Sequence, residues 1–389
     1  MQIFYARRTR TALALLGGLV AATAALSACS SSNSATSTST GAGTGATAAG
    51  SSSACTQAKA QLVQYEKPVQ FAKSIPPVDM AALKGKTIWI VFDDLAVSLD
   101  NAYAQSIKQA AQVAGVSIRE VNGQGTPTGD TQGFLEAVSA HAAAIYGWSI
   151  TATEISEGLQ KAQQAGIPVG LLVPGLPPEV KYWEQPSPQE IGPATADFAF
   201  VESGCKAGSV IGMLDLNVLT LSLATENAFV AQLKKLCPTC QIVSQNITDI
   251  TSLTTASGPD AVSLVQQNPK MTVLVDAVDP LSLFVVPALQ NAHLTGVKVV
   301  GLGGSSAPNQ AMVKAGTEAG GFAEPNPGPG GWQGFDWIAR IALHQPASEI
   351  NAFQNIPQTL LTTGDYSTVE PSLNVPGYQQ LFEHAWGVS

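Results

Sequence analysis

The sequence has few of the residues and motifs on which enzymes and metalloproteins depend. It has no G-x-S-x-G nucleophile turn, and the glycines of GQGTPTGD indicate a turn because no helix start follows them as a phosphate loop requires. Its four histidines, His141, His293, His344 and His384, show no ligand spacing, and there is no second C-x-x-C motif beside the single one. We therefore expect no catalytic residues, no bound metal and no cofactor.

Charged residues are scarce as well, and acids are in excess. They make up 12% of the chain, with 28 acidic against 19 basic residues and no basic tract. An acidic chain of this kind is not expected to bind nucleic acid or anionic lipid. Hydrophobic residues reach 45%, which suits a large core rather than intrinsic disorder.

The chain begins with the features of a bacterial export signal. A basic stretch with Arg7, Arg8 and Arg10 precedes an uncharged, mostly apolar run over residues 11–26. This run is too short and too rich in small residues to span a membrane comfortably. It leads into Leu-Ser-Ala-Cys, which resembles a lipobox, so we expect a signal peptide of residues 1–28 and lipid on Cys29. A signal peptide followed by a cysteine that occurs there by chance is the alternative.

A segment of low complexity follows the signal. Residues 29–54 are mostly Ser, Thr, Gly and Ala, without charge and without large apolar side chains. Such a segment cannot bury enough surface to offset its ordering entropy, so we expect a flexible tether. Without the three arginines of the signal, 16 basic residues face 28 acidic ones, a charge of about −12. The roughly 335 residues after the tether suffice for two ordinary domains.

The remaining cysteines suit an oxidising compartment. With Cys29 lipidated, Cys55, Cys205, Cys237 and Cys240 are left, an even number in an exported protein. Cys237 and Cys240 form the C-x-x-C motif between the helical run NAFVAQLKKL and the strand-like run QIVSQNI. A redox dithiol is expected after a strand, and a zinc site needs a second pair of ligands. We therefore expect a structural disulfide here, while a pairing of Cys55 with Cys205 stays open.

From residue 85 onward, short apolar runs alternate with helical patterns. The runs KTIWIVFDD, VSIREV, AAAIYGW and IPVGLLV come first, and SVIGMLD, CQIVSQNI, MTVLVDA and VKVVGLGG follow. Strands that are apolar on both faces and alternate with helices predict parallel sheets covered by helices. About eight such repeats exceed one ordinary sheet and divide near Gly192. We expect an α/β fold with two doubly wound parallel-sheet lobes.

These segments resemble the type I periplasmic solute-binding proteins, in particular the ribose-binding-like receptors of ABC importers. The resemblance covers roughly residues 84–340, and its most particular string is LQKAQQAGIPV, a helix that runs directly into a strand. It implies a monomer whose two lobes close on a small-molecule solute, a sugar or sugar-like compound, and deliver it to an ABC permease. Together with the lipobox, it implies an exported protein that lipid on Cys29 anchors to the outer face of the cytoplasmic membrane.

The resemblance also implies how the chain is divided. Three crossings rich in Pro and Gly are expected to form a hinge between the lobes. The crossings are expected near residues 185–192, 324–331 and 352–358. The N-terminal lobe is expected to hold residues 84–188 plus 326–350, and the C-terminal lobe residues 189–325 plus 356–389.

Ligands of such sheets bind at the carboxyl ends of the strands, so the expected solute contacts lie there. Tyr146 and Trp148 flank Gly147 and leave the strand on the same side, and Gly147 is expected to permit a tight turn. We expect at least one of the two aromatics, Trp148 first, to line the site; core packing is the alternative. The full set of expected ligand-binding residues is Phe92, Asp93, Asp94, Asn101, Tyr146, Trp148, Asp215, Asn217, Asp276, Asp279, Ser305 and Trp332.

Three departures from the ribose-like pattern make the expected site less polar. Ribose-like members have an Asp within the stretch of Tyr146 to Trp148, an Asp where Leu302 and Gly303 stand, and an arginine in the helix that matches SLATENAFVAQL. These residues contact sugar hydroxyls, so a less polar or aromatic solute is an alternative to a sugar. A second alternative is a sensor of the same fold that presents its solute to a membrane partner.

Overall fold

The computed structural model describes residues 45–69, 71, 73–96, 98–171, 181–182, 188–218, 220–249, 252–303, 305–345 and 358–388. The predicted signal peptide and Cys29 lie outside these ranges. Within them, no helix combines the length and the apolar character that a membrane span requires. The described part of the chain forms two α/β lobes, each built on its own sheet. The predicted fold class is therefore confirmed.

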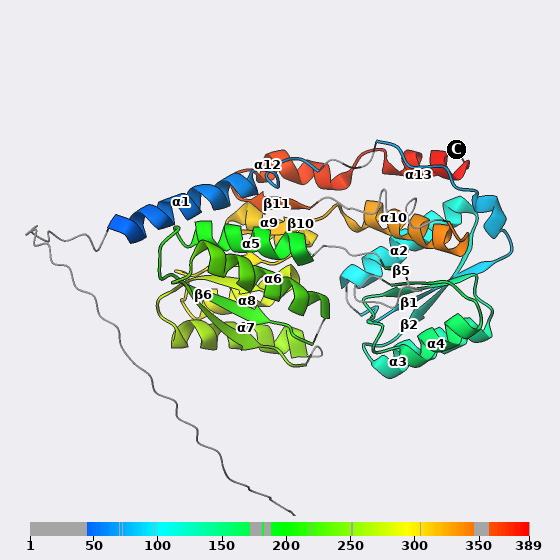
Figure 1. Cartoon of the computed structure of the whole chain (residues 1–389), viewed down its shortest axis with the longest axis horizontal. Helices are drawn as coiled ribbons and strands as arrows, with labels where there is room; N and C mark the ends of the chain where they lie inside the picture. Colours follow the sequence, from blue (N-terminus) through cyan, green and yellow to red (C-terminus); the bar gives the residue numbers. More distant parts are fainter. Residues whose placement is uncertain are drawn as a thin grey trace, which may run out of the picture. The chain divides into compact units, whose positions relative to one another are not determined.

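The N-terminal lobe is built on a parallel sheet with the strand order β2-β1-β3-β4-β5 (Figure 1). Its strands are β1 (Thr87–Phe92), β2 (Ser117–Asn122), β3 (Ala144–Trp148), β4 (Val169–Leu171) and β5 (Lys181–Tyr182). Its helices are the short η1 (Met80–Leu83), α2 (Ser98–Ala114), α3 (Pro127–Ser139), α4 (Ser156–Gln164), α10 (Pro327–Ala342) and α13 (Tyr378–Trp386).

Alternation of apolar side chains along β1 explains the two helical layers of this lobe. Ile88, Ile90 and Phe92 belong to one core, which they share with α2, α10 and α13. Val91 points to the opposite face and belongs to a second core with α3 and α4, against which Trp89 packs. Burying a large aliphatic side chain stabilises a fold by about 1.5–3 kcal/mol, so two apolar faces favour a sheet covered on both sides.

The C-terminal lobe holds the sheet β11-β10-β9-β8-β6-β7, in which β11 alone is antiparallel to its neighbour. Its strands are β6 (Val210–Asp215), β7 (Gln241–Asn246), β8 (Met271–Asp276), β9 (Lys298–Gly301), β10 (Gly320–Ala323) and β11 (Thr359–Thr362). Its helices are α1 (Gly45–Leu62), α5 (Pro188–Glu202), α6 (Thr220–Leu236), α7 (Leu253–Gln267), η3 (Asp279–Leu281), α8 (Ser282–Asn291), α9 (Ala307–Ala315), α12 (Tyr366–Val369) and η4 (Glu370–Asn374).

Strand β6 shows the same division of side chains. Ile211 and Met213 lie in the core that α1, α5 and α6 cover, while Val210 and Leu214 lie in the core under α7 and α8. Gly212 stands between them because a β-carbon there would come within 2.6 Å of the side chain of Met271. The side-chain pattern of one strand thus places helices on both faces of this sheet as well.

Helix α1 corrects the predicted extent of the flexible tether. Residues 45–54 were expected to be disordered, yet they form the first part of α1, which packs along α5 (Figure 1). Two features of the residues that follow explain why this part is helical. Ala58 and Leu62 are buried in the core of the C-terminal lobe, and a disulfide joins Cys55 to Cys205 after α5. Anchoring the second half of a helix lowers the cost of forming the first half.

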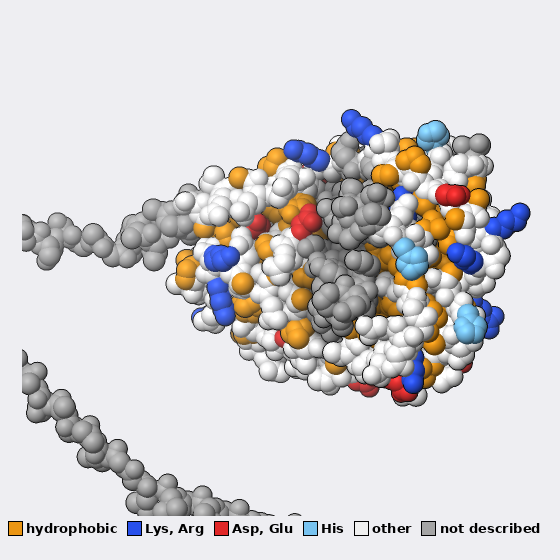
Figure 2. All heavy atoms as spheres, turned by 45° about the vertical axis from the view of Figure 1, so that its right-hand side comes forward, with side chains coloured by type: hydrophobic (Ala, Val, Ile, Leu, Met, Phe, Trp, Pro, Cys, Tyr) orange, Lys and Arg blue, Asp and Glu red, His pale blue; other side chains and the backbone are white. Residues whose placement is uncertain are grey.

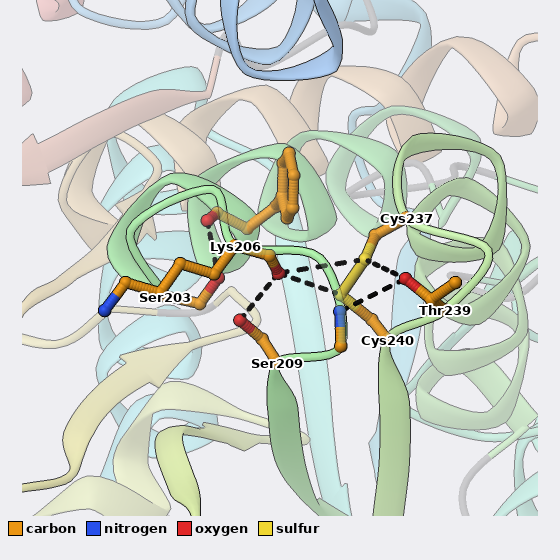
Figure 3. Close-up of a disulfide and its surroundings, with 8 residues drawn as sticks. Ser203, Lys206, Ser209, Cys237, Thr239 and Cys240 are labelled. Carbon is orange, nitrogen blue, oxygen red and sulfur yellow. Dashed lines mark hydrogen bonds between the residues drawn. A yellow bond between two sulfur atoms is a disulfide. The ribbon is translucent and has the colours of Figure 1, made fainter. Parts of the chain in front are cut away.

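The second disulfide joins Cys237 to Cys240 in the turn between α6 and β7 (Figure 3). Thr239, inside this turn, accepts a hydrogen bond of 3.1 Å from the amide of Gly208, which precedes β6. The C-x-x-C motif therefore closes a helix-to-strand turn beside the start of the neighbouring strand. This is the context in which the sequence favoured a structural disulfide.

The C-terminal helix corrects the predicted division between the lobes. Residues 356–389 were assigned to the C-terminal lobe, but α13 packs on α10 and α2 of the N-terminal lobe. Phe382 and Trp386 of α13 enter its core, and Trp386 donates a hydrogen bond of 2.8 Å to Asp336. Helix α13 has an apolar face, and packing against α10 removes this face from water. This burial explains why α13 lies on the N-terminal lobe. The other predicted lobe boundaries stay predictions.

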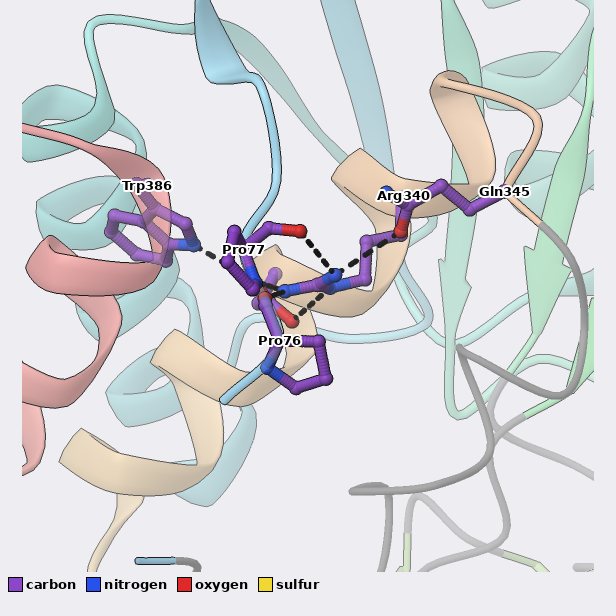
Figure 4. A network of polar contacts seen from close by, with 6 residues as sticks. Pro76, Pro77, Arg340, Gln345 and Trp386 are labelled. Atoms are coloured by element: carbon purple, nitrogen blue, oxygen red, sulfur yellow. Dashed lines mark hydrogen bonds and ion pairs between the residues drawn. The ribbon is translucent and has the colours of Figure 1, made fainter. Parts of the chain in front are cut away.

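An ion pair within α10 also binds the segment that precedes β1, so this segment is held against the N-terminal lobe (Figure 4). Arg340 and Asp336 are fully buried and their side chains are 2.7 Å apart. The guanidinium of Arg340 also donates to the carbonyl oxygens of Pro76 and Pro77. A buried arginine is tolerated only when its donors are satisfied, and here a carboxylate and backbone carbonyls satisfy them.

The described residues of segment 63–79 therefore contact both lobes. At its start, Thr359 of β11 donates to the carbonyl oxygen of Tyr65 at 2.7 Å. At its end, the amide of Val78 donates to the carbonyl oxygen of Ala385 in α13. Of the three predicted crossings, residues 324–331 are described throughout, whereas residues 185–187 of the first and 352–357 of the third lie outside the described ranges. Segment 63–79 adds a connection that the sequence did not indicate.

Candidate functional site

The carboxyl ends of β1 and β3 lie side by side in the N-terminal lobe. Their last residues, Phe92 and Trp148, are register partners with ring centroids 5.9 Å apart. The ring of Tyr103 from α2 lies 4.5 Å from that of Trp148. Trp148 is only 4% exposed, and Tyr146 is fully buried beside Trp337. Core packing, the alternative left open by the sequence, therefore describes both aromatics of the Tyr-Gly-Trp stretch.

The structure explains the glycine between the two aromatics differently from the tight turn that was expected. Gly147 lies within the strand, and a β-carbon there would come within 2.4 Å of Leu171 and 3.1 Å of the ring of Phe134. Gly147 thus makes room for the core on the α3 and α4 face, while its neighbours fill the core on the other face. It is required by close packing and not by a turn.

Trp148 nevertheless contributes to the strand-end surface through its indole nitrogen. The Nε1–H group donates a hydrogen bond of 2.9 Å to Oδ1 of Asp100, in the first turn of α2. Asp100 is 8% exposed. Burial raises the pKa of Asp100 to about 7; the bond from Trp148 lowers it and the charges of Asp93 and Asp94 raise it. Sequence reasoning missed Asp100, although its place in a helix turn directly after β1 was a usable signal.

Asp93 forms a pair with a second residue that was not predicted, Asp130 of α3. The pKa of Asp93 is raised to about 6 and that of Asp130 to about 8, and burial is the largest cause of both shifts. The hydrogen bond between the two lowers the former pKa and raises the latter, so Asp130 is the protonated partner that donates. Gly123 permits this approach, because a β-carbon there would meet Oδ1 of Asp130 at 1.8 Å.

Asp94, Asn101 and Glu154 complete the polar rim of the N-terminal lobe. Asp94 is partly exposed and accepts a hydrogen bond of 2.9 Å from the amide of Ala96. Asn101 is exposed and accepts one from Gln105. Glu154, after β3, is exposed and its charge raises the pKa values of Asp93 and Asp130. The predicted residues Asp93, Asp94 and Asn101 thus meet at one edge of the sheet.

In the C-terminal lobe, Asp215 and Asn217 occupy the corresponding edge at the end of β6. Burial raises the pKa of Asp215, and a hydrogen bond from Ser244 lowers it. Asn217 is exposed, and its backbone amide donates to the side chain of Asn246 at the end of β7. Glu226 of α6 holds this loop from below the surface, accepting a 2.8 Å hydrogen bond from the amide of Leu216. Burial raises the pKa of Glu226 to about 7.

The other acids predicted for this lobe are interior groups. Asp276 and Asp279 are fully buried, and Asp276 accepts a hydrogen bond of 2.8 Å from Ser282 at the start of α8. Asp279 lies beside Glu318, which is also fully buried, and burial together with the charge of Asp279 raises the pKa of Glu318 strongly. Ser305 is 7% exposed as well. These three predicted residues therefore lie inside the lobe and not at its surface.

Trp332, which was expected to reach the solute, lies inside the N-terminal lobe. It is 1% exposed and stacks on Trp386 of α13, with ring centroids 5.2 Å apart and planes inclined by 13°. Tyr378 and Phe382 complete the contact. The expectation was wrong because α13 was assigned to the other lobe, which would have left Trp332 uncovered.

One crossing between the lobes carries a polar contact that the sequence did not indicate. Glu324 lies between β10 of the C-terminal lobe and α10 of the N-terminal lobe. It accepts a hydrogen bond of 2.6 Å from the hydroxyl of Tyr103 in α2, and a longer one of 3.4 Å from Gln358 before β11. Burial raises the pKa of Glu324, and these two bonds lower it. Tyr103 thus contacts both Trp148 at the strand ends and Glu324 between β10 and α10.

The surroundings of the strand ends delimit the site further. None of their His, Cys, Asp and Glu side chains form a group of three or more that could hold a metal ion. A pocket of about 580 Å³ lies between residues 77–81 and α13, and it shares no residue with the strand ends. The chemistry available at the strand ends is therefore hydrogen bonding and charge, from carboxylates and amides.

The fold places this chain among known structures, although its sequence does not. No protein-family model and no curated protein matches the sequence. An ABC sugar transporter subunit from Rhodobacter sphaeroides has a TM-score of 0.63 at 17% identity and covers 72% of this chain and 99% of its own. A glucose-galactose binding protein from Geobacillus stearothermophilus has a TM-score of 0.63 at 14% identity, covering 72% and 99%.

A Mycobacterium smegmatis protein in complex with β-D-fucofuranose is similar over a longer part of the chain. Its TM-score is 0.62 at 16% identity, and the match covers 78% of this chain and 98% of that one. The described lobes therefore have the two-lobed α/β fold of periplasmic solute-binding proteins of ABC sugar transporters. At these identities the likeness concerns the fold.

Proposed function

We propose that this protein is the exported, lipid-anchored solute receptor of an ABC importer, and that it acts as a monomer. Its two lobes close on one small solute, a sugar or sugar-like compound, and present it to a membrane permease. The observation that carries the proposal is the pair of polar strand-end edges, one in each lobe, in a fold whose solved neighbours are sugar-binding proteins. Ligands of doubly wound sheets bind at such edges.

The solute contacts follow from exposure. In the N-terminal lobe, Asp93, Asp94 and Asn101 offer carboxylate and amide groups, with Asp100 behind them. In the C-terminal lobe, Asn217 offers an exposed amide. Sugar hydroxyls donate to carboxylates and amide oxygens, and these bonds strengthen when closure of the lobes excludes water. Of the remaining predicted contacts, Asp215 is partly exposed and the others are buried.

The anchor is a separate part of the proposal. A lipobox before Cys29 and a low-complexity segment before α1 support attachment at the outer face of the cytoplasmic membrane. Expression in a bacterial host with labelled fatty acid tests this directly. Label on the wild-type chain and its loss in Cys29→Ser would support the anchor, whereas equal labelling of both would contradict it.

A solute-sensing receptor is the second candidate, because the same fold and the same edges serve both roles. The two differ in the membrane partner, so the neighbouring genes, permease and ATPase or sensor kinase, distinguish them. An aromatic solute is less well supported, because Phe92, Tyr146 and Trp148 are buried against one another.

Thermal unfolding of the full chain in the presence of sugars, polyols, nucleosides and small aromatics tests the receptor function. A solute that binds only the folded state at a hundredfold excess over its Kd adds about 2.7 kcal/mol of stability, which raises Tm by several degrees. Stabilisation by a sugar or polyol supports the proposal. Stabilisation by nucleosides or aromatics alone would replace the solute class, and no stabilisation by any compound would contradict a receptor for small solutes.

A further inference from the structure

Glu324 is a carboxylate that accepts hydrogen bonds from elements of both lobes. Tyr103 of α2, in the N-terminal lobe, donates to its Oε1 at 2.6 Å. Gln358, directly before β11 of the C-terminal lobe, donates to its Oε2 at 3.4 Å. Rotation of one lobe against the other would move the two donors relative to each other, and a single carboxylate cannot then keep both bonds. The pair of bonds therefore belongs to the arrangement of the lobes described here.

The backbone on either side of Glu324 has little freedom to adapt to such a rotation. Glu324 precedes Pro325 and Asn326 precedes Pro327, and a residue before proline is largely restricted to extended conformations. Asn326 has φ −48° and ψ 153°, and its amide donates to the carbonyl oxygen of Leu373 in η4 at 2.9 Å. Because this link is stiff and held in place, a movement of the lobes has to act on the side-chain bonds of Glu324.

The bond from Tyr103 has the properties of a strong contact. Tyr103 is only 4% exposed, so water hardly competes for its hydroxyl. Burial and the charge of Glu324 raise the pKa of Tyr103 well above its usual value, so the hydroxyl keeps the proton that it donates. A separation of 2.6 Å is typical of a hydroxyl that donates to a carboxylate, and such bonds are roughly twice as strong as bonds between neutral groups.

Tyr103 also connects this contact to the proposed solute edge. Its ring lies 4.5 Å from that of Trp148, whose indole donates the 2.9 Å hydrogen bond to Asp100. A shift of Tyr103 would therefore disturb the packing that orients the Asp100 carboxylate. The position of the lobes and the shape of the edge thus depend on one shared side chain.

Two ion pairs of the described surface lie within single lobes. Lys108–Glu120 belongs to the N-terminal lobe and Lys298–Glu202 to the C-terminal lobe, so neither holds one lobe against the other. On the face drawn in Figure 2, basic side chains lie singly or in small groups and form no continuous patch. Glu324 differs from the acids of these ion pairs because its two donors come from different lobes.

From these contacts we propose that Tyr103 and Glu324 form a lock, a contact that favours the described arrangement of the lobes and breaks when the lobes rotate. The inference rests on the proposed function, because it concerns the movement by which the lobes close, and it adds a means of regulation to that function. A lock that favours one arrangement changes the fraction of molecules competent to bind, and the apparent affinity changes by the same factor.

Distances between the lobes test the lock without any solute. Spin labels on Glu136→Cys of α3 and Gln266→Cys of α7 place one probe on each lobe, at exposed helical positions. In the full chain carrying Cys29→Ser, the four other native cysteines form disulfides and leave only the two introduced thiols free. Pulsed electron paramagnetic resonance then gives the distribution of distances between the lobes.

Removing the bond should change this distribution. Tyr103→Phe keeps the ring against Trp148 but removes the donor, and a hydrogen bond to a charged group is worth about tenfold or more in an equilibrium. We expect the population of other interlobe distances to rise about tenfold relative to the main one. Glu324→Gln keeps an acceptor without the charge, so a smaller change in the same direction is expected. Gln358→Ala removes the bond from the other lobe and should act in the same direction, so the test does not depend on a single core variant.

Tyr146→Phe is the matched control. Tyr146 is fully buried in the same core as Tyr103, and its hydroxyl has no hydrogen-bond partner among the described residues. The change removes the same chemical group from the same core without touching the lock. The distribution of distances should therefore equal that of the wild type.

The possible outcomes separate this inference from the proposed function. A shifted or broadened distribution in Tyr103→Phe and Glu324→Gln, with an unchanged one in Tyr146→Phe, supports the lock. A distribution that is unchanged in Tyr103→Phe, or that changes equally in Tyr146→Phe, overturns the lock and leaves the solute receptor standing. Failure of every compound in the thermal panel contradicts the receptor function and leaves the lock to be judged by these distances alone.

Discussion

Asp100 accepts a 2.9 Å hydrogen bond from the indole of Trp148, and this bond links the aromatic core of the N-terminal lobe to its polar edge. Trp148 packs against Phe92 and Tyr103, and Tyr103 in turn donates a hydrogen bond to Glu324, between β10 and α10. A side chain that seemed suited to stack on a solute thus orients a carboxylate instead.

Replacing Trp148 with Phe removes the donor and keeps an aromatic ring. Asp100 then remains buried with one hydrogen bond fewer, so we expect a loss of about 1–3 kcal/mol in the free energy of unfolding, measured with urea. The double variant Trp148→Phe/Asp100→Asn should lose less than the sum of the single changes, because the bond is shared. Trp89→Phe, on the opposite face of β1, is the matched control, and strict additivity at Trp148 and Asp100 would argue against a bond.

Stability should fall as the pH rises through the acid range of the polar edge. The pKa values of Asp93, Asp100 and Asp130 are raised from 3.8 to about 6, 7 and 8. The folded state thus holds these protons more tightly than the unfolded state, so their contribution is complete below pH 3.8 and is lost as the pH rises through the folded pKa values. Urea unfolding of the wild type should show a decline between about pH 5 and pH 8.

The same series with Asp130→Asn identifies the main contributor. An Asn side chain can still donate to Asp93 but does not titrate, so the decline should become shallower above about pH 6. Glu136→Gln on the same helix should leave the slope unchanged. A slope that is equal in wild type and Asp130→Asn would show that Asp130 is not protonated in the folded state.

Gly147→Ala tests why a glycine separates the two aromatics. The added methyl group would approach Leu171 and Phe134 at 2.4 and 3.1 Å, so we expect a loss of about 1–3 kcal/mol by overpacking. Gly296→Ala is the control, because a β-carbon there meets nothing within 4 Å. Equal stability of the two variants would mean that the core beside Gly147 adapts without cost.

The two disulfides should differ in their contribution to stability. Cys55–Cys205 closes a separation of 150 residues and Cys237–Cys240 one of 3 residues. The chain-entropy relation then gives about 5 kcal/mol for the first and about 2 kcal/mol for the second. Urea unfolding of the two double Cys→Ser variants measures both. A larger loss from the short loop would reverse the expected order, and the long-loop variant should also release α1 to proteolysis.

The alternation of apolar runs and helical patterns was sufficient to predict the fold class, because β-branched runs such as those of β1 and β8 must be buried on both faces. It could not place α13 or α1. Helix α13 is amphipathic and helix α1 is rich in small residues. Where such a helix packs depends on which core of the folded protein has an uncovered face, and the local sequence does not show this. Trp332 and α13 cover each other, so an error in placing one produced an error in placing the other.

The candidate site was predictable in position but only partly in composition. Parallel strands bring their carboxyl ends to one edge, and the structure has Asp93, Asp94 and Asn217 at such edges. That these residues contact a solute stays a prediction. The depth of each side chain below that edge depends on its neighbours, which the local sequence does not reveal. Asp279 is buried because Gly301 and Gly321 leave room for its carboxyl group, and those glycines belong to other strands.

The most direct test of the central claim asks whether one solute engages both strand-end edges. The sugar or polyol that most raises Tm in the panel is titrated calorimetrically into the full chain, Asp94→Ala and Asn217→Ala, one variant from each lobe. A receptor that closes its lobes on a shared solute predicts a single site per chain and a loss of about tenfold or more in affinity from each variant. Full affinity in either variant would confine the solute to one lobe and contradict the account.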